Sequence, residues 1–256
     1  MFFEQDRAAA FELVDGIILL PGTAEGAEGH FALDTGATRT VLNRTYCALP
    51  GENVQNAVTF SGSEQSSAVT KLEDARVRFA DTDLWLVSVP VLDMSYVECP
   101  LRDAGAFGVR FLGSIGANLL STGRLVIDYH ACRVVFNASS VPPHTREAPL
   151  FNETVPVIEL DLGEGAQRFA LDTGANHFII DRACAPRALL GSVPDGMPCT
   201  LPPFRFAGRE YVGVEGLVTD LGGMREALHV DGIFGYQLLR ESVCCFDFAA
   251  GFLYLS

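Results

Sequence analysis

The sequence predicts an all-β fold with a few short helices, built as two copies of one unit. Apolar and alternating runs of strand length recur along the chain, and turns rich in glycine and proline separate them. The seven-residue motif FALDTGA occurs twice, which indicates an internal duplication. The 256 residues are 48% hydrophobic and 20% charged, as is typical of folded globular proteins.

Each copy has its own series of strands, because short apolar runs bounded by turn residues favour strands over helices. In the first half, strands are expected at residues 11–20, 30–34, 57–60, 75–80, 84–92 and 124–136. In the second half, they are expected at residues 155–162, 168–172, 177–181, 210–220, 243–248 and 251–255. Short helices are expected at 117–122 and 236–241, each directly after a glycine. The polar, proline-rich segment 141–149 is predicted to link an N-terminal lobe, residues 1–140, to a C-terminal lobe, residues 150–256.

The two copies align in two blocks. Residues 31–44 match residues 169–182 at an offset of 138, and residues 113–129 match residues 232–248 at an offset of 119. The second copy is therefore 19 residues shorter between the blocks. We expect the extra residues of the first copy around 56–70, where a strand–turn–strand pattern suits a mobile flap that closes on a ligand. Its substrate-contacting residues would be Phe60, Ser61, Gly62 and Ser63, and the alternative is an ordinary surface hairpin.

The aspartates of the repeated motif, Asp34 and Asp172, each follow an apolar strand. An acid in such surroundings is costly to bury unless it is hydrogen-bonded or paired. A two-fold axis relating the copies can bring the two carboxyls face to face. Two carboxylates about 3 Å apart cannot both ionise, so the pair holds one proton. One member can then take a proton from water while the other hydrogen-bonds to a carbonyl oxygen, which suits amide hydrolysis.

The doubled motif resembles that of the aspartic peptidases. Each LDTGA is followed by a glycine-ended element of that family, Ser114-Ile115-Gly116 in the first copy and Ile233-Phe234-Gly235 in the second. The DTGA form and the short lobes most resemble the retropepsin-like group, while the fusion of both lobes resembles the pepsin-like enzymes. The resemblance implies two retropepsin-like β-barrel lobes related by pseudo-two-fold symmetry, in the aspartic protease fold, with a peptide-binding cleft between them.

The resemblance also implies the roles of individual residues. Asp34 and Asp172 would be the catalytic pair of an aspartic-type endopeptidase. The supporting residues would be Thr35 and Thr173 as the grip between lobes, Gly36 and Gly174 at the turns, and Ala37 and Ala175 after them. Two features depart from the family: Ser114 stands where an aliphatic residue is usual, and no flap tyrosine occurs near residues 60–67. Substrate preference therefore stays open.

Three function classes compete with a peptidase. A catalytically inactive homologue would bind peptides in the same cleft without cutting them, although both aspartates are intact. A sugar-kinase or actin-like ATPase also uses D-x-G followed by threonine, but such folds need a longer chain and a glycine-rich adenosine site. Nucleic-acid binding is disfavoured by a net charge of −14. The five histidines lack metal-ligand spacing, so no metal or cofactor is expected.

The expected partner is a polypeptide substrate, and the expected state is a monomer, because one chain carries both halves of the site. No stretch of the sequence is apolar enough and long enough for a transmembrane helix. Seven cysteines, an odd number without a C-x-x-C pair, favour a reducing compartment. We therefore expect a cytoplasmic protein, with an exported or periplasmic one as the alternative if a signal peptide has been removed.

Overall fold

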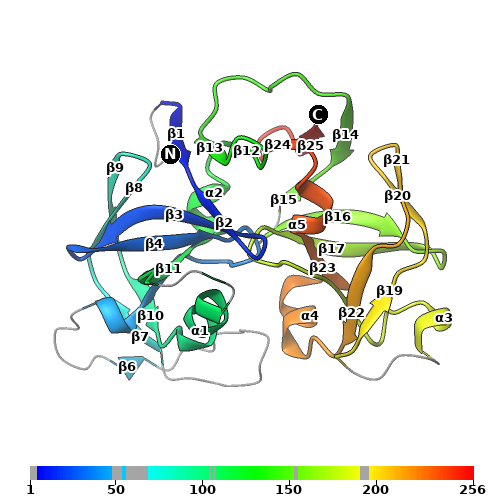
Figure 1. Ribbon diagram of the computed structural model, residues 1–256, viewed down its shortest axis with the longest axis horizontal. Coiled ribbons are helices and arrows are strands. Elements are labelled where there is room, and N and C mark those ends of the chain that lie inside the picture. Colours follow the sequence, from blue (N-terminus) through cyan, green and yellow to red (C-terminus); the bar gives the residue numbers. More distant parts are fainter. Residues whose placement is uncertain are drawn as a thin grey trace.

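Two strand-rich lobes lie side by side beneath a third sheet that both halves of the chain build (Figure 1). The computed structural model describes residues 5–47, 54–55, 69–103, 105, 108–152, 155–190 and 196–256. Strands dominate these residues and the helices are short, so the predicted mainly-β fold is confirmed. No helix among the described residues has the length and apolar character needed to cross a membrane.

The N-terminal lobe is built on a ten-stranded sheet in the order β6-β7-β10-β5-β11-β4-β3-β8-β9, with β2 paired to β3. The alternation that predicts these strands also sets their burial. In β8, for example, residues 75, 77 and 79 are buried and the two between them are exposed. The strands are β2 (Glu12–Val14), β3 (Ile17–Ala24), β4 (Ala27–Leu33), β5 (Val41–Asn43), β6 (Val54–Gln55), β7 (Val69–Leu72), β8 (Ala75–Phe79), β9 (Thr82–Leu86), β10 (Val89–Leu92) and β11 (Phe111–Ile115).

The C-terminal lobe repeats the central part of this arrangement in a seven-stranded sheet of order β15-β16-β17-β23-β18-β22-β19. In both lobes a strand of the second repeat block lies between two strands of the first block, β11 between β4 and β5, and β23 between β17 and β18. The strands are β15 (Phe151–Asn152), β16 (Pro156–Asp161), β17 (Ala166–Asp172), β18 (Phe178–Asp181), β19 (Pro198–Thr200), β22 (Glu215–Thr219) and β23 (Gly232–Gly235), with β20 (Phe204–Phe206) and β21 (Arg209–Tyr211) as a separate hairpin.

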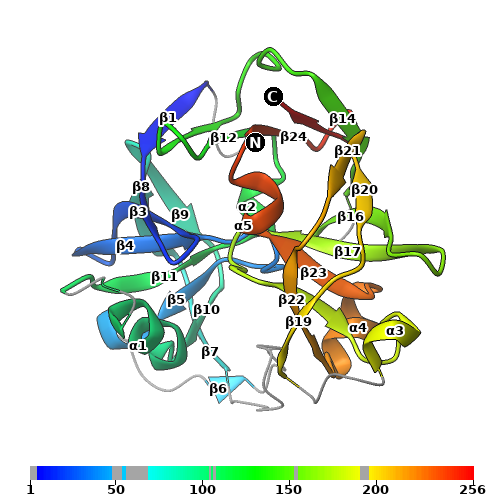
Figure 2. The ribbon, with the colours of Figure 1, turned by 45° about the vertical axis from the view of Figure 1, so that its right-hand side comes forward.

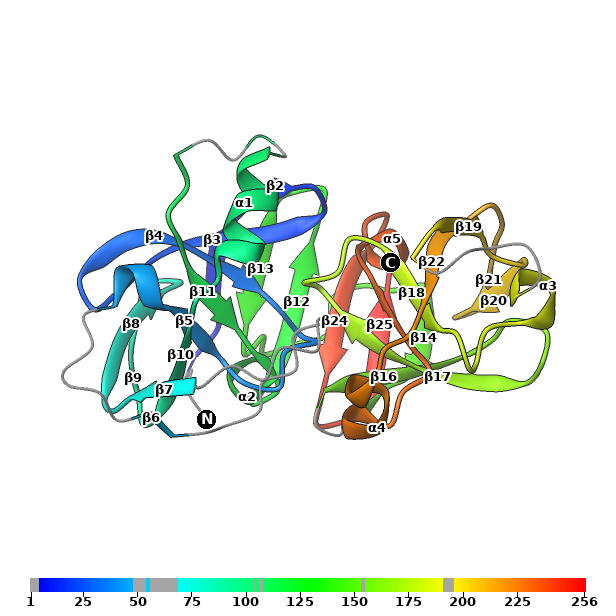
Figure 3. The same ribbon diagram turned by 90° about the horizontal axis from the view of Figure 1, so that it is seen from below.

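The third sheet joins the lobes and has the order β1-β13-β12-β24-β25-β14 (Figure 2). At its centre β12 and β24 pair antiparallel, and Val126 faces Cys245, its own equivalent in the repeat. This self-pairing is what a two-fold axis through the sheet requires, and β12 and β24 lie between the lobes when the molecule is seen from below (Figure 3). The strands are β1 (Arg7–Ala10), β12 (Arg124–Asp128), β13 (Arg133–Phe136), β14 (Arg146–Pro149), β24 (Val243–Asp247) and β25 (Phe252–Leu255).

The segment 141–149, predicted to be a linker, contributes β14 to this shared sheet, where Ala148 pairs with Leu253. Its proline content does not prevent this, because β14 is an edge strand, where a missing N–H is tolerated. The lobe boundaries at residues 1–140 and 150–256 stay predictions.

The two helices expected after glycines occur as α2 (Ala117–Leu120) and α5 (Tyr236–Leu239), each shorter than expected. Three further helices and one 3₁₀ turn were not predicted. The longest, α1, contains Pro100, and its sequence SYVECPLRD has few strong helix formers, so local propensity could not reveal it. These elements are α1 (Ser95–Asp103), α3 (Arg187–Leu190), α4 (Gly223–Leu228) and the 3₁₀ turn at Arg44–Tyr46.

Most of the extra length of the first copy lies in two places, which corrects the expectation of a single insertion. Between β5 and β7 the N-terminal lobe has 25 residues, against 16 between β18 and β19. Between β10 and β11 it has 18 residues, which include α1, against 12 between β22 and β23. The expected flap residues Phe60, Ser61, Gly62 and Ser63 lie outside the described residues. The strands on either side of that segment, β6 and β7, pair antiparallel.

Candidate active site

The two aspartates lie where the lobes meet, each at the end of a buried strand. Asp34 directly follows β4, and its N–H donates to the carbonyl of Ile115 at 3.0 Å. Asp172 ends β17, which runs parallel to β23 and pairs there with Gly235. The glycine-ended elements of the second repeat block thus fix the position of each aspartate-bearing loop.

The threonines of the motif join the two lobes with four hydrogen bonds that obey the two-fold symmetry. The N–H of Thr35 donates to Oγ1 of Thr173 at 3.1 Å, and the N–H of Thr173 donates to Oγ1 of Thr35 at 3.0 Å. Each hydroxyl then donates across the axis to a strand carbonyl, that of Leu171 at 2.6 Å and that of Leu33 at 2.7 Å. Both threonines are completely buried, so each group depends on its partner.

The glycines of the motif bring each loop against the carboxyl of the opposite lobe. A Cβ added at Gly36 would lie 2.2 Å from Cγ of Asp172, and one added at Gly174 would lie 2.8 Å from Cγ of Asp34. Neither glycine has a positive φ, so close approach and not backbone freedom is what requires glycine here. The two carboxyls hydrogen-bond to each other and are half-buried at the lobe boundary.

The pair is biased toward keeping a proton. Burial, together with the negative charge of Asp172, raises the pKa of Asp34 well above its ordinary value. Burial also raises the pKa of Asp172, against the opposing effect of the Gly174 N–H, which donates to Oδ1 of Asp172 at 2.7 Å. The pair can therefore hold a charged oxygen and a protonated one side by side at a higher pH than an isolated aspartate would allow.

The alanines after each motif contribute backbone groups only. The N–H of Ala37 donates to Oδ1 of Asp34 at 2.7 Å, and the N–H of Ala175 lowers the pKa of Asp172. Neither methyl group can donate a hydrogen bond to the carboxyls. The carbonyls of the same alanines accept hydrogen bonds from the first residues of α2 and α5. The N–H of Ala117 donates to Ala37 at 2.7 Å, and the N–H of Tyr236 donates to Ala175 at 3.2 Å.

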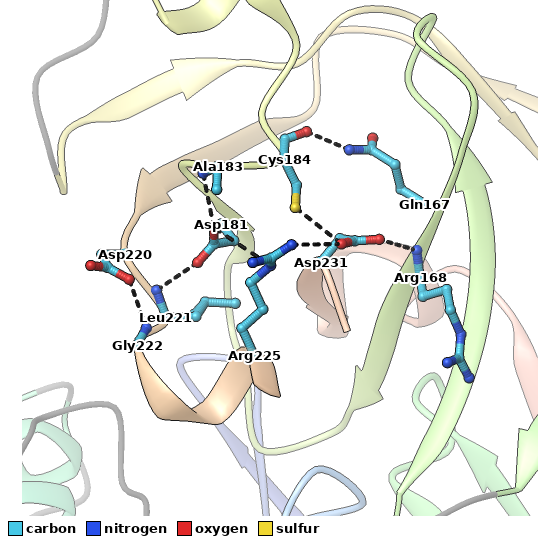
Figure 4. Close-up of polar contacts among 10 residues, drawn as sticks. All are labelled: Gln167, Arg168, Asp181, Ala183, Cys184, Asp220, Leu221, Gly222, Arg225 and Asp231. Atoms are coloured by element: carbon cyan, nitrogen blue, oxygen red, sulfur yellow. Dashed lines mark hydrogen bonds and ion pairs between the residues drawn. The ribbon is translucent and has the colours of Figure 1, made fainter. Parts of the chain in front are cut away.

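Different residues support the two loops from behind, and sequence reasoning identified neither set. In the N-terminal lobe, Oδ1 of Asn118 accepts from the N–H of Thr40 at 2.6 Å and from its hydroxyl at 3.1 Å. In the C-terminal lobe, Arg225 of α4 lies between the carboxylates of Asp181 and Asp231 (Figure 4). Asp181 is almost fully buried at the end of β18, and a buried charge is costly unless it is compensated. Arg225 and two backbone N–H groups provide this compensation.

A thiol lies in the same cluster without the properties of a nucleophile. Sγ of Cys184 is 3.0 Å from Oδ1 of Asp231 (Figure 4). Burial and the hydrogen bond to Asp231 raise the pKa of Cys184 to about 11, so it stays a neutral thiol. All seven cysteines, each among the described residues, are unpaired.

Comparison with known proteins bears on the fold. No protein-family model matches this sequence, and no curated protein matches it. Among solved structures, the aspartic proteinase from Irpex lacteus superposes with a TM-score of 0.59 at 15% identity. The match covers 98% of this chain and 97% of that one. The fold is that of the aspartic proteinases, in the pepsin-like form with two lobes in one chain.

The threonine grip predicts a large loss of stability on removal of one hydroxyl. Thr35→Val keeps the β-branched shape but leaves the N–H of Thr173 and the carbonyl of Leu171 buried without partners. We expect a loss on the order of 3 kcal/mol of unfolding free energy, measured by denaturant titration. Thr23→Val is the control, at a half-buried site in β3 where the hydroxyl makes no hydrogen bond to any described residue, and it should change stability by about 0.5 kcal/mol or less. An equal effect of both variants would contradict the role of the grip.

Proposed function

We propose that the protein is an aspartic-type endopeptidase that hydrolyses peptide bonds with a water held between Asp34 and Asp172. The observation that carries this proposal is the mutual approach of the two loops, in which each motif glycine packs against the carboxyl of the other lobe. Such packing holds two carboxyls in one partly exposed site and makes them share a proton. The alternative of an inactive peptide-binding homologue has no equivalent support, because neither aspartate nor any motif glycine is replaced.

The proposed reaction uses the two carboxyls in complementary roles. The charged carboxylate accepts a proton from water as the water oxygen bonds to the carbonyl carbon of the substrate. The protonated carboxyl donates to the carbonyl oxygen, where negative charge develops. Breakdown of the tetrahedral intermediate then breaks the C–N bond, and a proton passes from the pair to the departing amine. No covalent bond to the enzyme forms.

One chain contributes both aspartates, so we infer that the active species is a monomer that acts on a polypeptide. Digestion of a fluorogenic peptide library tests the proposed activity. We expect cleavage that a statine-type transition-state analogue abolishes, because its hydroxyl occupies the position of the water. Tight binding of the analogue with no cleavage of any peptide would instead support the inactive homologue.

The pH dependence of this activity should be shifted upward relative to an acid-adapted enzyme. The carboxyls receive only backbone donors from Ala37 and Ala175, and burial raises the pKa of both aspartates. We expect a bell-shaped kcat/KM profile centred at about pH 5–6.5. Ala37→Ser or Ala175→Ser would add a hydroxyl donor that stabilises the charged form, so the acidic limb should move to lower pH. A wild-type optimum near pH 2–3, or an unmoved limb in both variants, would contradict this assignment.

A further inference from the structure

A pocket of about 510 Å³ opens beside the first catalytic loop. One wall begins at Thr38, four residues after Asp34, and the others come from the end of β9, the β9–β10 turn and the first turn of α2. Four residues of chain extend over about 14 Å at most. The pocket is therefore within reach of an extended peptide whose attacked bond lies at the aspartates.

The apolar part of the pocket is exposed to an unusual degree. Trp85 is 63% exposed and Val87 is 76% exposed, and both side chains line the pocket. Trp85 is the single tryptophan of the chain. Ser88, next to Val87, has a φ of 57°, so a tight turn holds the valine outward. Large apolar side chains grouped around a pocket in this way are typical of a binding site, since nothing in the fold is gained by exposing them.

The pocket also contains an arginine to which no described residue supplies a counter-charge. Arg39 is exposed and makes no ion pair or side-chain hydrogen bond within the part of the chain that the structure describes. The neighbouring Arg76 differs, because it stacks on Trp85 at 5.9 Å and lies 3.4 Å from Asp83. No described residue of the lining is acidic. In a protein of net charge −14, a free arginine in a pocket points to an anionic ligand group.

The backbone around Arg39 is fixed while its side chain is free. On one side, the carbonyl of Ala37 accepts from Ala117 at 2.7 Å. On the other, the N–H of Thr40 donates to Asn118 at 2.6 Å, and the Thr40 hydroxyl accepts from Gly116 at 3.1 Å. Binding at Arg39 therefore needs no reordering of the main chain, which lowers its entropic cost.

We propose that this pocket is a specificity subsite for a carboxylate of the polypeptide substrate, within about four residues of the cleaved bond. The carboxylate pairs with Arg39, and the apolar part of the same segment packs on Trp85 and Val87. The proposal rests on the peptidase function proposed above and names the substrate class that the site prefers. The carboxylate belongs either to a glutamate or aspartate side chain or to the C-terminus of the peptide.

Matched fluorogenic peptides test the proposal. One cleavable sequence is made with Glu, Gln or Lys at each of the four positions on either side of the cleaved bond, with free and amidated C-termini. We expect Glu at one position to raise kcat/KM about tenfold over Gln. Arg39→Gln should remove this advantage, so that the Glu and Gln peptides are cleaved with equal kcat/KM, and Arg39→Glu should convert it into a preference for Lys. Arg133→Gln, at an exposed arginine in β13 of the shared sheet, is the control and should behave as wild type.

The outcomes separate the subsite from the activity itself. Cleavage with no preference among Glu, Gln and Lys, or a preference that Arg39→Gln leaves intact, would overturn the subsite and leave the peptidase function standing. An advantage seen only with free C-termini and lost in Arg39→Gln would assign the carboxylate to the chain end. Failure to cleave any peptide of the set, including the Gln peptides, would count against the peptidase function.

Discussion

Asp34→Asn and Asp172→Asn should each reduce kcat by about 10³-fold or more while the fold survives. Either amide removes one of two complementary groups, the base that takes the proton from water or the acid that donates to the carbonyl oxygen. Because the two act as a unit, the double variant should lose little more than either single one. Peptide cleavage by purified variants, with circular dichroism to check the fold, measures the effect.

The same substitutions should leave stability unchanged or raise it, with a gain that depends on pH. The folded-state pKa of Asp34 is raised above 3.8, so the unfolded chain releases this proton at lower pH than the folded one. The pair therefore destabilises the native state progressively as pH rises above about 4. The gain in Tm for the Asn variants should grow from pH 4 to pH 7. Asp220→Asn, whose amide oxygen can still accept from Gly222, is the control and should change neither activity nor this pH trend.

Gly36→Ala should abolish most of the activity through the carboxyl of the opposite lobe. The new methyl group would lie 2.2–2.4 Å from Cγ and Oδ2 of Asp172, so the carboxyl or the loop has to move by about an ångström. A displacement of that size at reacting groups costs on the order of 10²-fold in rate. We expect at least that loss in kcat, with a fall in stability of about 1–3 kcal/mol from overpacking.

Gly174→Ala provides an internal comparison, because its added methyl would lie 2.8–3.0 Å from Asp34. It should impair activity less than Gly36→Ala. Gly26→Ala is the control: nothing lies within 4 Å of its added Cβ, but its φ is +84°. It should lose about 1 kcal/mol of stability and keep full activity. Wild-type kcat in Gly36→Ala would contradict the close approach of the two loops.

The duplicated motif was sufficient to predict the fold class and the pair of aspartates, because repetition in sequence imposes a two-fold relation in space. The contacts around that axis could not be predicted, since they depend on strand register. Asp128 and Asp247 are equivalent in the repeat, yet Asp247 faces Arg124 across the shared sheet and binds it at 2.6–2.8 Å, whereas Asp128 faces Val243. Asp128 instead accepts backbone N–H groups of the following turn.

The pocket at Arg39 could not be predicted from the sequence either. Its walls come from three segments distant along the chain, the loop that follows Asp34, the β9–β10 turn and α2. A lone arginine after the motif carries no signal, and Trp85 alternates with buried neighbours as in any half-buried strand. Only the tertiary arrangement brings the charge and the apolar side chains together.

The stoichiometry of active-site titration tests the central claim most directly, namely that a single chain carries a complete two-aspartate site. A tight statine-type inhibitor is added to a known concentration of chain while residual peptide cleavage is measured. Activity should fall linearly to zero at one inhibitor molecule per chain and stay independent of dilution. An end point of one inhibitor per two chains, or cleavage that persists at saturating inhibitor, would contradict the account.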